Sequence, residues 1–159
     1  ETLVESHAIV DHLDEQVPAE KALLPRSGAE RRKVLQATVI ATGSGEKAGV
    51  CVYERHIHAP EAVAHDWIAR CLMQVEGGLT QLEKSAGTPY FFRDRITATD
   101  VAVTVVASYM RMRLPEAFPT TKYPKLAAIV DRCEAMPQFA STRPSADEVM
   151  PAKGTVARA

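Results

Sequence analysis

Hydrophobic residues along the chain recur every three or four positions, the spacing of amphipathic α-helices. The longest such stripe runs through Ile68, Leu72, Val75, Leu79 and Leu82. It predicts a helix that begins at Pro60, a favourable first-turn residue. We expect Trp67 and Cys71 to widen its buried face. No segment gives a convincing strand pattern, so the sequence predicts an all-helical protein.

The same spacing predicts other helices on both sides of this stripe. The first covers residues 6–16 and ends before Pro18, and a long second helix covers 29–56. Three glycines inside the second helix each cost about 1 kcal/mol relative to alanine. We expect a bent but continuous helix, with the glycines giving either a kink or room for another backbone. A later helix begins at Pro124, and one helical turn lies around Phe139.

The strongest helix start lies in the stretch ITATDVAVTVV. Thr97 is the expected N-cap, and Asp100 reaches back to it as in a capping box. The residues that follow, 101–107, are apolar on nearly every side, so we expect a central, buried helix. Asp100 should therefore be buried and structural, held by backbone N–H groups.

Composition narrows the class of protein further. A chain of 159 residues with 46% hydrophobic residues fits one globular domain. A net charge of −1 gives no electrostatic case for nucleic acid, and no apolar run approaches the ~18 residues of a membrane span. Cys51, Cys71 and Cys133 are far apart and have the pattern of reduced core thiols, which favours a cytoplasmic protein.

The pair Glu5-Ser6, directly before the first helix, is the first candidate for chemistry. A helix N-terminus attracts a carboxylate, a serine hydroxyl can donate to the same anion, and a glutamate can pair with an ammonium group. The pair would therefore suit a ligand that carries both an α-amino group and an α-carboxylate. The alternative is that Ser6 is only a helix cap and Glu5 a solvated residue.

Other polar residues carry weaker signals. Tyr53 and Tyr109 are candidates to line a ligand pocket, although core packing is the simpler interpretation. His56 and His58 are two positions apart and point to different sides of a helix, so we expect no metal site.

Four stretches, in this order and at these distances, resemble the glutathione transferase family and together cover nearly the whole chain. ETLVESHAIVDHLDE resembles its glutathione-binding segment, and ALLPRSGAERRKVL its interdomain linker. ITATDVAV resembles the capping box and hydrophobic staple of its helical domain, and YPKLAAIVDRCEAMPQF its closing pattern. KALLPRSGAERRKVL and VYERH are most similar to bacterial members.

The resemblance implies a helical bundle that follows an N-terminal thioredoxin-like α/β domain, most of which is absent here. Residues 1–17 would be the last helix of that truncated domain, 18–28 a linker, 29–142 the all-helical C-terminal domain and 143–159 a tail. The family expectation is a cytoplasmic homodimer.

The resemblance also assigns roles by position. Glu5 and Ser6 would hold the γ-glutamyl end of glutathione, and Glu46 and Thr42 are candidates for a contact across the dimer. Thr38, Tyr53 and Tyr109 would belong to the wall of a site for a small apolar electrophile, whereas Thr97 and Asp100 would be structural. The group that stabilises the glutathione thiolate is expected upstream of Glu1, so no residue here takes that role.

The leading hypothesis is that the intact protein conjugates glutathione, as substrate, to an apolar electrophile. A non-catalytic helical interaction module of the same family is the alternative, and an unrelated helical bundle with coincidental motifs is a third.

Overall fold

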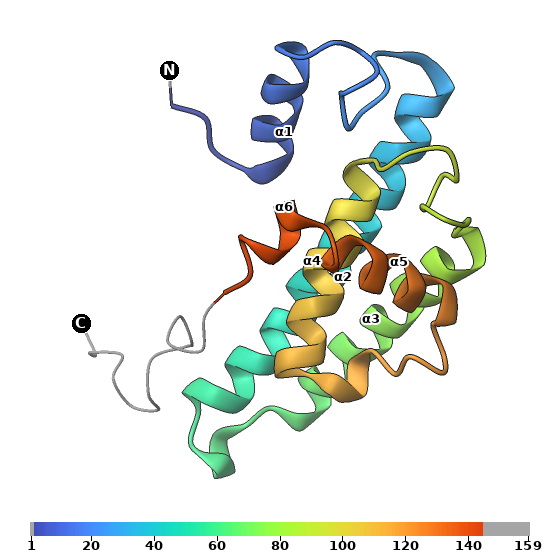
Figure 1. Cartoon of the computed structure of the whole chain (residues 1–159). Helices are drawn as coiled ribbons and strands as arrows, with labels where there is room; N and C mark the ends of the chain where they lie inside the picture. Colours follow the sequence, from blue (N-terminus) through green and yellow to red (C-terminus); the bar gives the residue numbers. More distant parts are fainter. Residues whose placement is uncertain (1, 145–159) are drawn as a thin grey trace.

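The computed structural model describes residues 2–144, and all the secondary-structure elements in that range are helices (Figure 1). The elements are α1 (Ser6–Glu15), α2 (Gly28–Ile57), η1 (Pro60–Ala62), α3 (His65–Ser85), α4 (Ala98–Arg113), η2 (Pro115–Ala117), α5 (Pro124–Glu134) and α6 (Pro137–Ala140). The prediction of an all-helical bundle is confirmed, including the short turn around Phe139. The tail beyond residue 144 lies outside the described residues.

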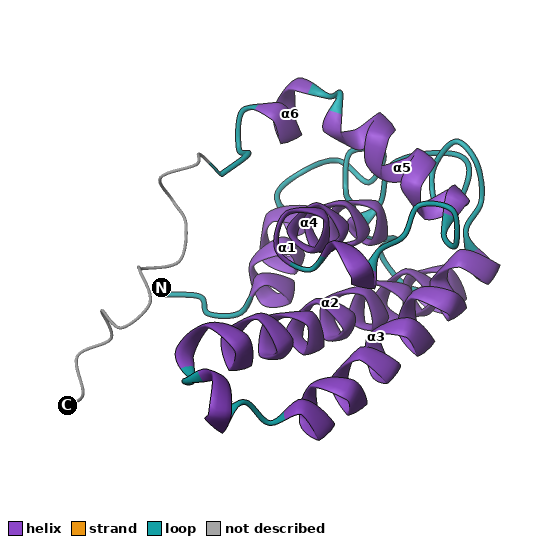
Figure 2. Cartoon of the chain, turned by 90° about the horizontal axis from the view of Figure 1, so that it is seen from below, coloured by secondary structure: helices purple, strands orange, loops and turns teal. Residues whose placement is uncertain are grey.

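Helices α2, α3 and α4 form the centre of the bundle, with α2 packed along both of the others and α5 against α4 (Figure 2). The predicted α3 stripe lies in this core, where Leu72 is half-buried and the other four members are buried. All three cysteines are buried and unpaired, as predicted. Helix α1 lies at one end of the bundle, where Val10 packs on a second apolar cluster of Leu24, Val34 and Ala98.

Helix α3 begins at His65, so the predicted start at Pro60 is wrong. Pro60 instead opens a single 3-10 turn, after which Val63 is extended, with φ −68° and ψ 123°. The Glu54 carboxylate stabilises this extended segment, because its Oε1 accepts the Ala64 N–H at 3.0 Å. A side chain from the preceding helix therefore delays the start of α3.

Trp67 does not lie in the core as predicted, because 43% of its surface is exposed. It occupies the edge of α3, where the Lys47 Nζ lies 5.9 Å from the ring centroid. One helical position moves a side chain by about 100°, so Ile68 is buried while Trp67 faces outward.

Helix α2 continues through its three glycines, as predicted. A β-carbon at Gly45 would lie 2.7 Å from Cγ2 of Val106 on α4, whereas one at Gly49 would meet no atom within 4 Å. Gly45 therefore allows the close approach of α2 and α4, which was one of the two predicted explanations for the glycines.

The start of α4 contains both halves of the expected capping box. Asp100 is fully buried, and its Oδ2 accepts hydrogen bonds from the N–H and the hydroxyl of Thr97, each at 2.8 Å. Its Oδ1 accepts the N–H of Phe91 at 2.7 Å. The carboxylate thus holds both the helix start and the loop that precedes it.

The linker between α1 and α2 is held by hydrogen bonds from α1 on one side and from the start of α4 on the other. Asp14, buried at the end of α1, accepts the N–H groups of Leu23 and Leu24 at 2.8 and 2.7 Å. Arg95, just before α4, donates to the Ala22 carbonyl at 2.6 Å. The Ala98 N–H donates to the Leu23 carbonyl at 3.0 Å. These bonds set the position of α1 against the helical bundle.

Helix α4 is central, but it is not buried on every side. Val103, Ala107 and Met110 are buried, whereas Val105 is 59% exposed. The apolar face that remains open lies toward α1, and it forms part of the cavity described below. None of the helices described here has the length and apolar character needed to cross a membrane.

Candidate functional site

The N-terminus of α1 has an unusual backbone. Glu5 is its N-cap, with φ 76° and ψ 127°. Residues other than glycine seldom take a positive φ, and such positions cluster at functional sites. The Glu5 Oε1 accepts the Ser6 N–H at 2.9 Å and lies 3.3 Å from the Ser6 hydroxyl. Glu5 therefore caps the helix, whereas Ser6 is its first helical residue and not the cap.

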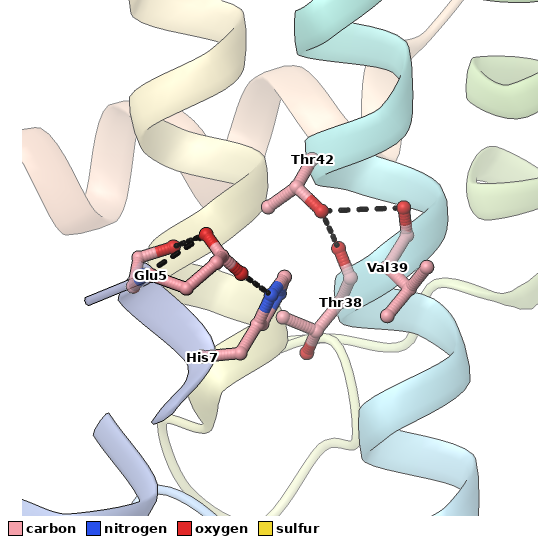
Figure 3. A network of polar contacts seen from close by, with 6 residues as sticks. Glu5, His7, Thr38, Val39 and Thr42 are labelled. Atoms are coloured by element: carbon pink, nitrogen blue, oxygen red, sulfur yellow. Dashed lines mark hydrogen bonds and ion pairs between the residues drawn. The ribbon is translucent and has the colours of Figure 1, made fainter. Parts of the chain in front are cut away.

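The Glu5 carboxylate is exposed and has three local donors, which are the Ser6 N–H, the Ser6 hydroxyl and His7 Nδ1. His7 Nδ1 lies 2.9 Å from its Oε2 (Figure 3). This hydrogen bond from His7, followed by the one from the Ser6 N–H, lowers the pKa of Glu5 below the ordinary glutamate value. The carboxylate is therefore ionised at neutral pH and still open to solvent, as a partner for an ammonium group must be.

His7 also faces inward. Its Nε2 is buried and has no hydrogen-bond partner among the described residues. The ring lies between Glu5 and the two threonines of α2, Thr38 and Thr42 (Figure 3). His7 is thus the group that connects the exposed carboxylate with the interior.

A cavity of about 180 Å³ lies between α1, α2 and α4, beside His7. Its lining is largely aliphatic: Ser6, His7, Val10, Leu24, Leu35, Thr38, Thr42, Ala98, Val101, Ala102, Val105 and Val106. The two threonine hydroxyls are engaged within α2, since Thr38 donates to the Val34 carbonyl at 2.7 Å and Thr42 to the Thr38 carbonyl at 3.2 Å. An apolar molecule with few polar groups would suit this space.

The predicted wall residues do not share one hollow. Thr38 lines the cavity beside His7, whereas Tyr109 lines a second hollow of about 600 Å³ between α4 and the segment around α6. Val105 lines both, so the two hollows adjoin along α4. Tyr53 is 53% exposed and lines neither of them. Burial raises the pKa of Tyr109, and the neighbouring Tyr53 hydroxyl adds to this.

The candidates for a contact across a dimer lie on α2. Glu46 is exposed, whereas Thr42 lines the cavity of its own chain. Among residues 2–144 no group of His, Cys, Asp and Glu side chains is arranged to hold a metal ion. Burial raises the pKa values of the Cys51 and Cys133 thiols, so neither is an activated nucleophile.

Sequence reasoning missed His7 and Val105. A histidine directly after the acid-serine pair, within reach of the same carboxylate, was a usable signal for His7. For Val105, the signal was the run of residues 101–107, which is apolar on more sides than a helix needs to pack on its own bundle.

Residues 66–132 match a sequence model described as the C-terminal domain of glutathione S-transferase. A search of curated proteins gave no match.

Several solved structures are similar to the chain. One is a glutathione transferase family member from Pseudomonas fluorescens Pf-5 with bound S-(propanoic acid)-glutathione. It is 26% identical, has a TM-score of 0.83, and the match covers 91% of this chain and 73% of that one. Another is a glutathione S-transferase from Methylobacterium radiotolerans in complex with glutathione sulfonate. It is 28% identical with a TM-score of 0.81, and the match covers 94% and 70%.

A third is a glutathione S-transferase from Methylobacillus flagellatus KT with bound glutathione, which has a TM-score of 0.84. Its identity of 23%, over 91% of this chain and 71% of that one, makes it a likeness of fold.

Proposed function

We propose that the chain, whose residues 66–132 match the C-terminal domain of glutathione S-transferase, binds glutathione at Glu5 and Ser6 and takes part in glutathione conjugation. The observation that carries the proposal is the N-terminus of α1. There the exposed, ionised Glu5 carboxylate is held at a positive φ of 76° beside Ser6. Glutathione ends in an α-ammonium and an α-carboxylate on the same carbon, and this pair of groups matches an acid and a helix N-terminus.

Each end of that ligand has a named partner. The ammonium group binds the Glu5 carboxylate, and the carboxylate binds the Ser6 hydroxyl and the free N–H groups of the first turn of α1. Backbone strain at Glu5 supports this assignment, because the strain has no evident use in capping alone.

The second substrate is an apolar electrophile that occupies the hollows along α4. The cavity of about 180 Å³ that includes Thr38 is larger than the ~150 Å³ cavity known to hold benzene. Tyr109 lines the adjoining hollow, and Tyr53 is a neighbour of Tyr109. The glutathione sulfur attacks the electrophilic carbon, a carbon–sulfur bond forms, and the leaving group departs with its electron pair.

We place the group that stabilises the glutathione thiolate outside residues 1–159, as the resemblance implies. In the same proposal the protein is a homodimer and Glu46 reaches the partner's glutathione. Residues 1–17 then belong with a thioredoxin-like domain and residues 29–142 with the helical domain.

The test is calorimetric titration of the full-length protein with glutathione, compared with Ser6→Ala and Glu5→Gln. A hydrogen bond to a charged group contributes about 1.5–3 kcal/mol, so each substitution should raise the Kd by about 10- to 100-fold. Ser85→Ala is the matched control, because this exposed hydroxyl only contacts the Gln81 carbonyl of its own helix. Equal affinities for all four proteins would refute the assignment.

Conjugation is measured separately with an activated aryl halide. Ser6→Ala should raise KM for glutathione more than it lowers kcat, because Ser6 contacts the substrate away from the reacting sulfur. Tight glutathione binding without turnover of any electrophile tested would favour the non-catalytic interaction module.

A further inference from the structure

The geometry of His7 goes beyond a role in packing. Its Nδ1 lies 2.9 Å from the Glu5 carboxylate, and its buried Nε2 has no partner in the described chain. An ionised carboxylate can only accept a hydrogen bond, so Nδ1 must carry the proton. In the neutral ring Nε2 is then a bare acceptor, which is the form that suits an apolar surrounding.

A second proton would change both sides of the ring. The imidazolium would neutralise the charge of Glu5 and would place an N–H at Nε2 with no acceptor beside it. Burying an unsatisfied donor is unfavourable, and so is a positive charge next to a position meant for an ammonium group.

We propose that His7 is a positioning residue for glutathione: its neutral ring orients the Glu5 carboxylate toward the ammonium group, and its protonated ring weakens glutathione binding. This inference rests on the proposed glutathione site at Glu5 and Ser6. It assigns to His7 a part in specificity for a ligand with a free α-ammonium group, and it makes that affinity depend on pH.

Glu5 is the charged group in contact with His7, at 2.9 Å from its Nδ1. At the start of α1 His7 faces Glu5 and the uncharged Ser6, and Asp11, one helical turn further along α1, is paired with Arg31 of α2 at 2.6 Å. On α2 His7 faces the uncharged Thr38 and Thr42, and α4 contributes aliphatic side chains to the same cavity. No other charged side chain lines the cavity. Histidine is the side chain that ordinarily changes charge between about pH 5 and 8, whereas the hydrogen bond from His7 lowers the pKa of Glu5 below the ordinary glutamate value.

The experiment uses S-methylglutathione, whose sulfur does not titrate, with the full-length protein at constant ionic strength. Its Kd is measured at pH 7.5 and 5.5 for the wild type, His7→Asn, His7→Ala and His12→Asn. Asparagine keeps an N–H near the position of Nδ1 but does not titrate. His12 is the matched control, because it is an exposed histidine on the same helix that contacts only Gln16.

The wild type and His12→Asn should bind about five- to tenfold more weakly at pH 5.5, as expected for one added charge about 4–6 Å away in a surface environment. His7→Asn should change less than about twofold. His7→Ala should bind more weakly than His7→Asn at pH 7.5, because it loses the donor to Glu5. An N-acetylated analogue, which lacks the ammonium group, should show no such fall in affinity in the wild type.

Two outcomes would overturn the inference in different ways. If His7→Asn keeps the pH dependence of the wild type, the inference fails while the glutathione site stands. If none of the four proteins binds S-methylglutathione at either pH, the proposed function fails and takes the inference with it. Thermal unfolding of His7→Asn within a few degrees of the wild type shows that the variant is folded, and His7→Ala gives a second comparison.

Discussion

Replacement of Asp100 by alanine should destabilise the helical bundle by about 2–5 kcal/mol. The carboxylate is fully buried and accepts the N–H groups of Phe91 and Thr97 at 2.7 and 2.8 Å. Alanine leaves these two N–H groups buried without an acceptor, at about 1–3 kcal/mol each, whereas the Thr97 hydroxyl, the third donor, can rotate. Relief of the desolvated carboxylate offsets part of this cost.

The amide of Asp100→Asn provides a graded comparison. It keeps one acceptor oxygen and can satisfy one of the two N–H groups, so about half of the destabilisation should remain. For a domain of this size, 1 kcal/mol corresponds to about 2–4 °C in Tm, so Asp100→Ala should melt about 6–12 °C below the wild type if the loss is near 3 kcal/mol.

The assay is urea unfolding followed by circular dichroism at 222 nm, with an unchanged m value as evidence that only stability has changed. Asp131→Ala is the control, since this exposed carboxylate forms a single pair with Arg111 and should cost less than about 1 kcal/mol. Asp100→Ala within 1 kcal/mol of the wild type would refute the accounting. Equal losses for alanine and asparagine would show that charge matters and not the number of acceptors.

Two further predictions concern α2. Gly49→Ala should stabilise the protein by about 1 kcal/mol in urea unfolding, because its β-carbon meets open space. Gly45→Ala should lose that gain, because its β-carbon would lie 2.7 Å from Val106, and a stabilised Gly45→Ala would contradict the packing described here. The hydrogen bond from Arg55 lowers the pKa of Glu116, so this pair stabilises the protein above the ordinary glutamate range and the contribution is lost as pH falls through the lowered pKa. The urea midpoints of the wild type and Glu116→Gln should therefore differ slightly at pH 7 and converge as pH falls below the lowered pKa of Glu116, and a difference that stays constant with pH would exclude the ion pair as the cause.

Local patterns predicted most of the helices because a helix and its caps depend on neighbours in sequence. The α3 stripe needs only helical spacing, and the capping box of Thr97 and Asp100 spans three residues. The predicted start of α3 was wrong because the true start depends on Glu54. This residue lies ten positions before Ala64, whose N–H its carboxylate accepts. The bond from Asp100 to Phe91 was missed for the same reason, since it joins a helix to a loop.

The candidate site follows the same division. Glu5 and Ser6 are adjacent, so their shared place at a helix N-terminus could be predicted. The cavity could not, because Val10, Thr38 and Val105 come from three helices whose relative placement depends on the linker. The positive φ of Glu5 could not be predicted from the sequence, because glycine favours this backbone conformation and glutamate does not.

The linker bonds have a consequence for how this protein can vary. Asp14 and Arg95 bind main-chain atoms of the linker, and every residue carries these whatever its side chain. Exposed linker positions such as Ala19 and Glu20 are therefore free to change without loss of these contacts, whereas Asp14 and Arg95 are not. The position of α1 thus depends on Asp14 and Arg95, together with the ion pair between Asp11 and Arg31 at 2.6 Å, and the exposed surface of the linker can vary in evolution or be engineered.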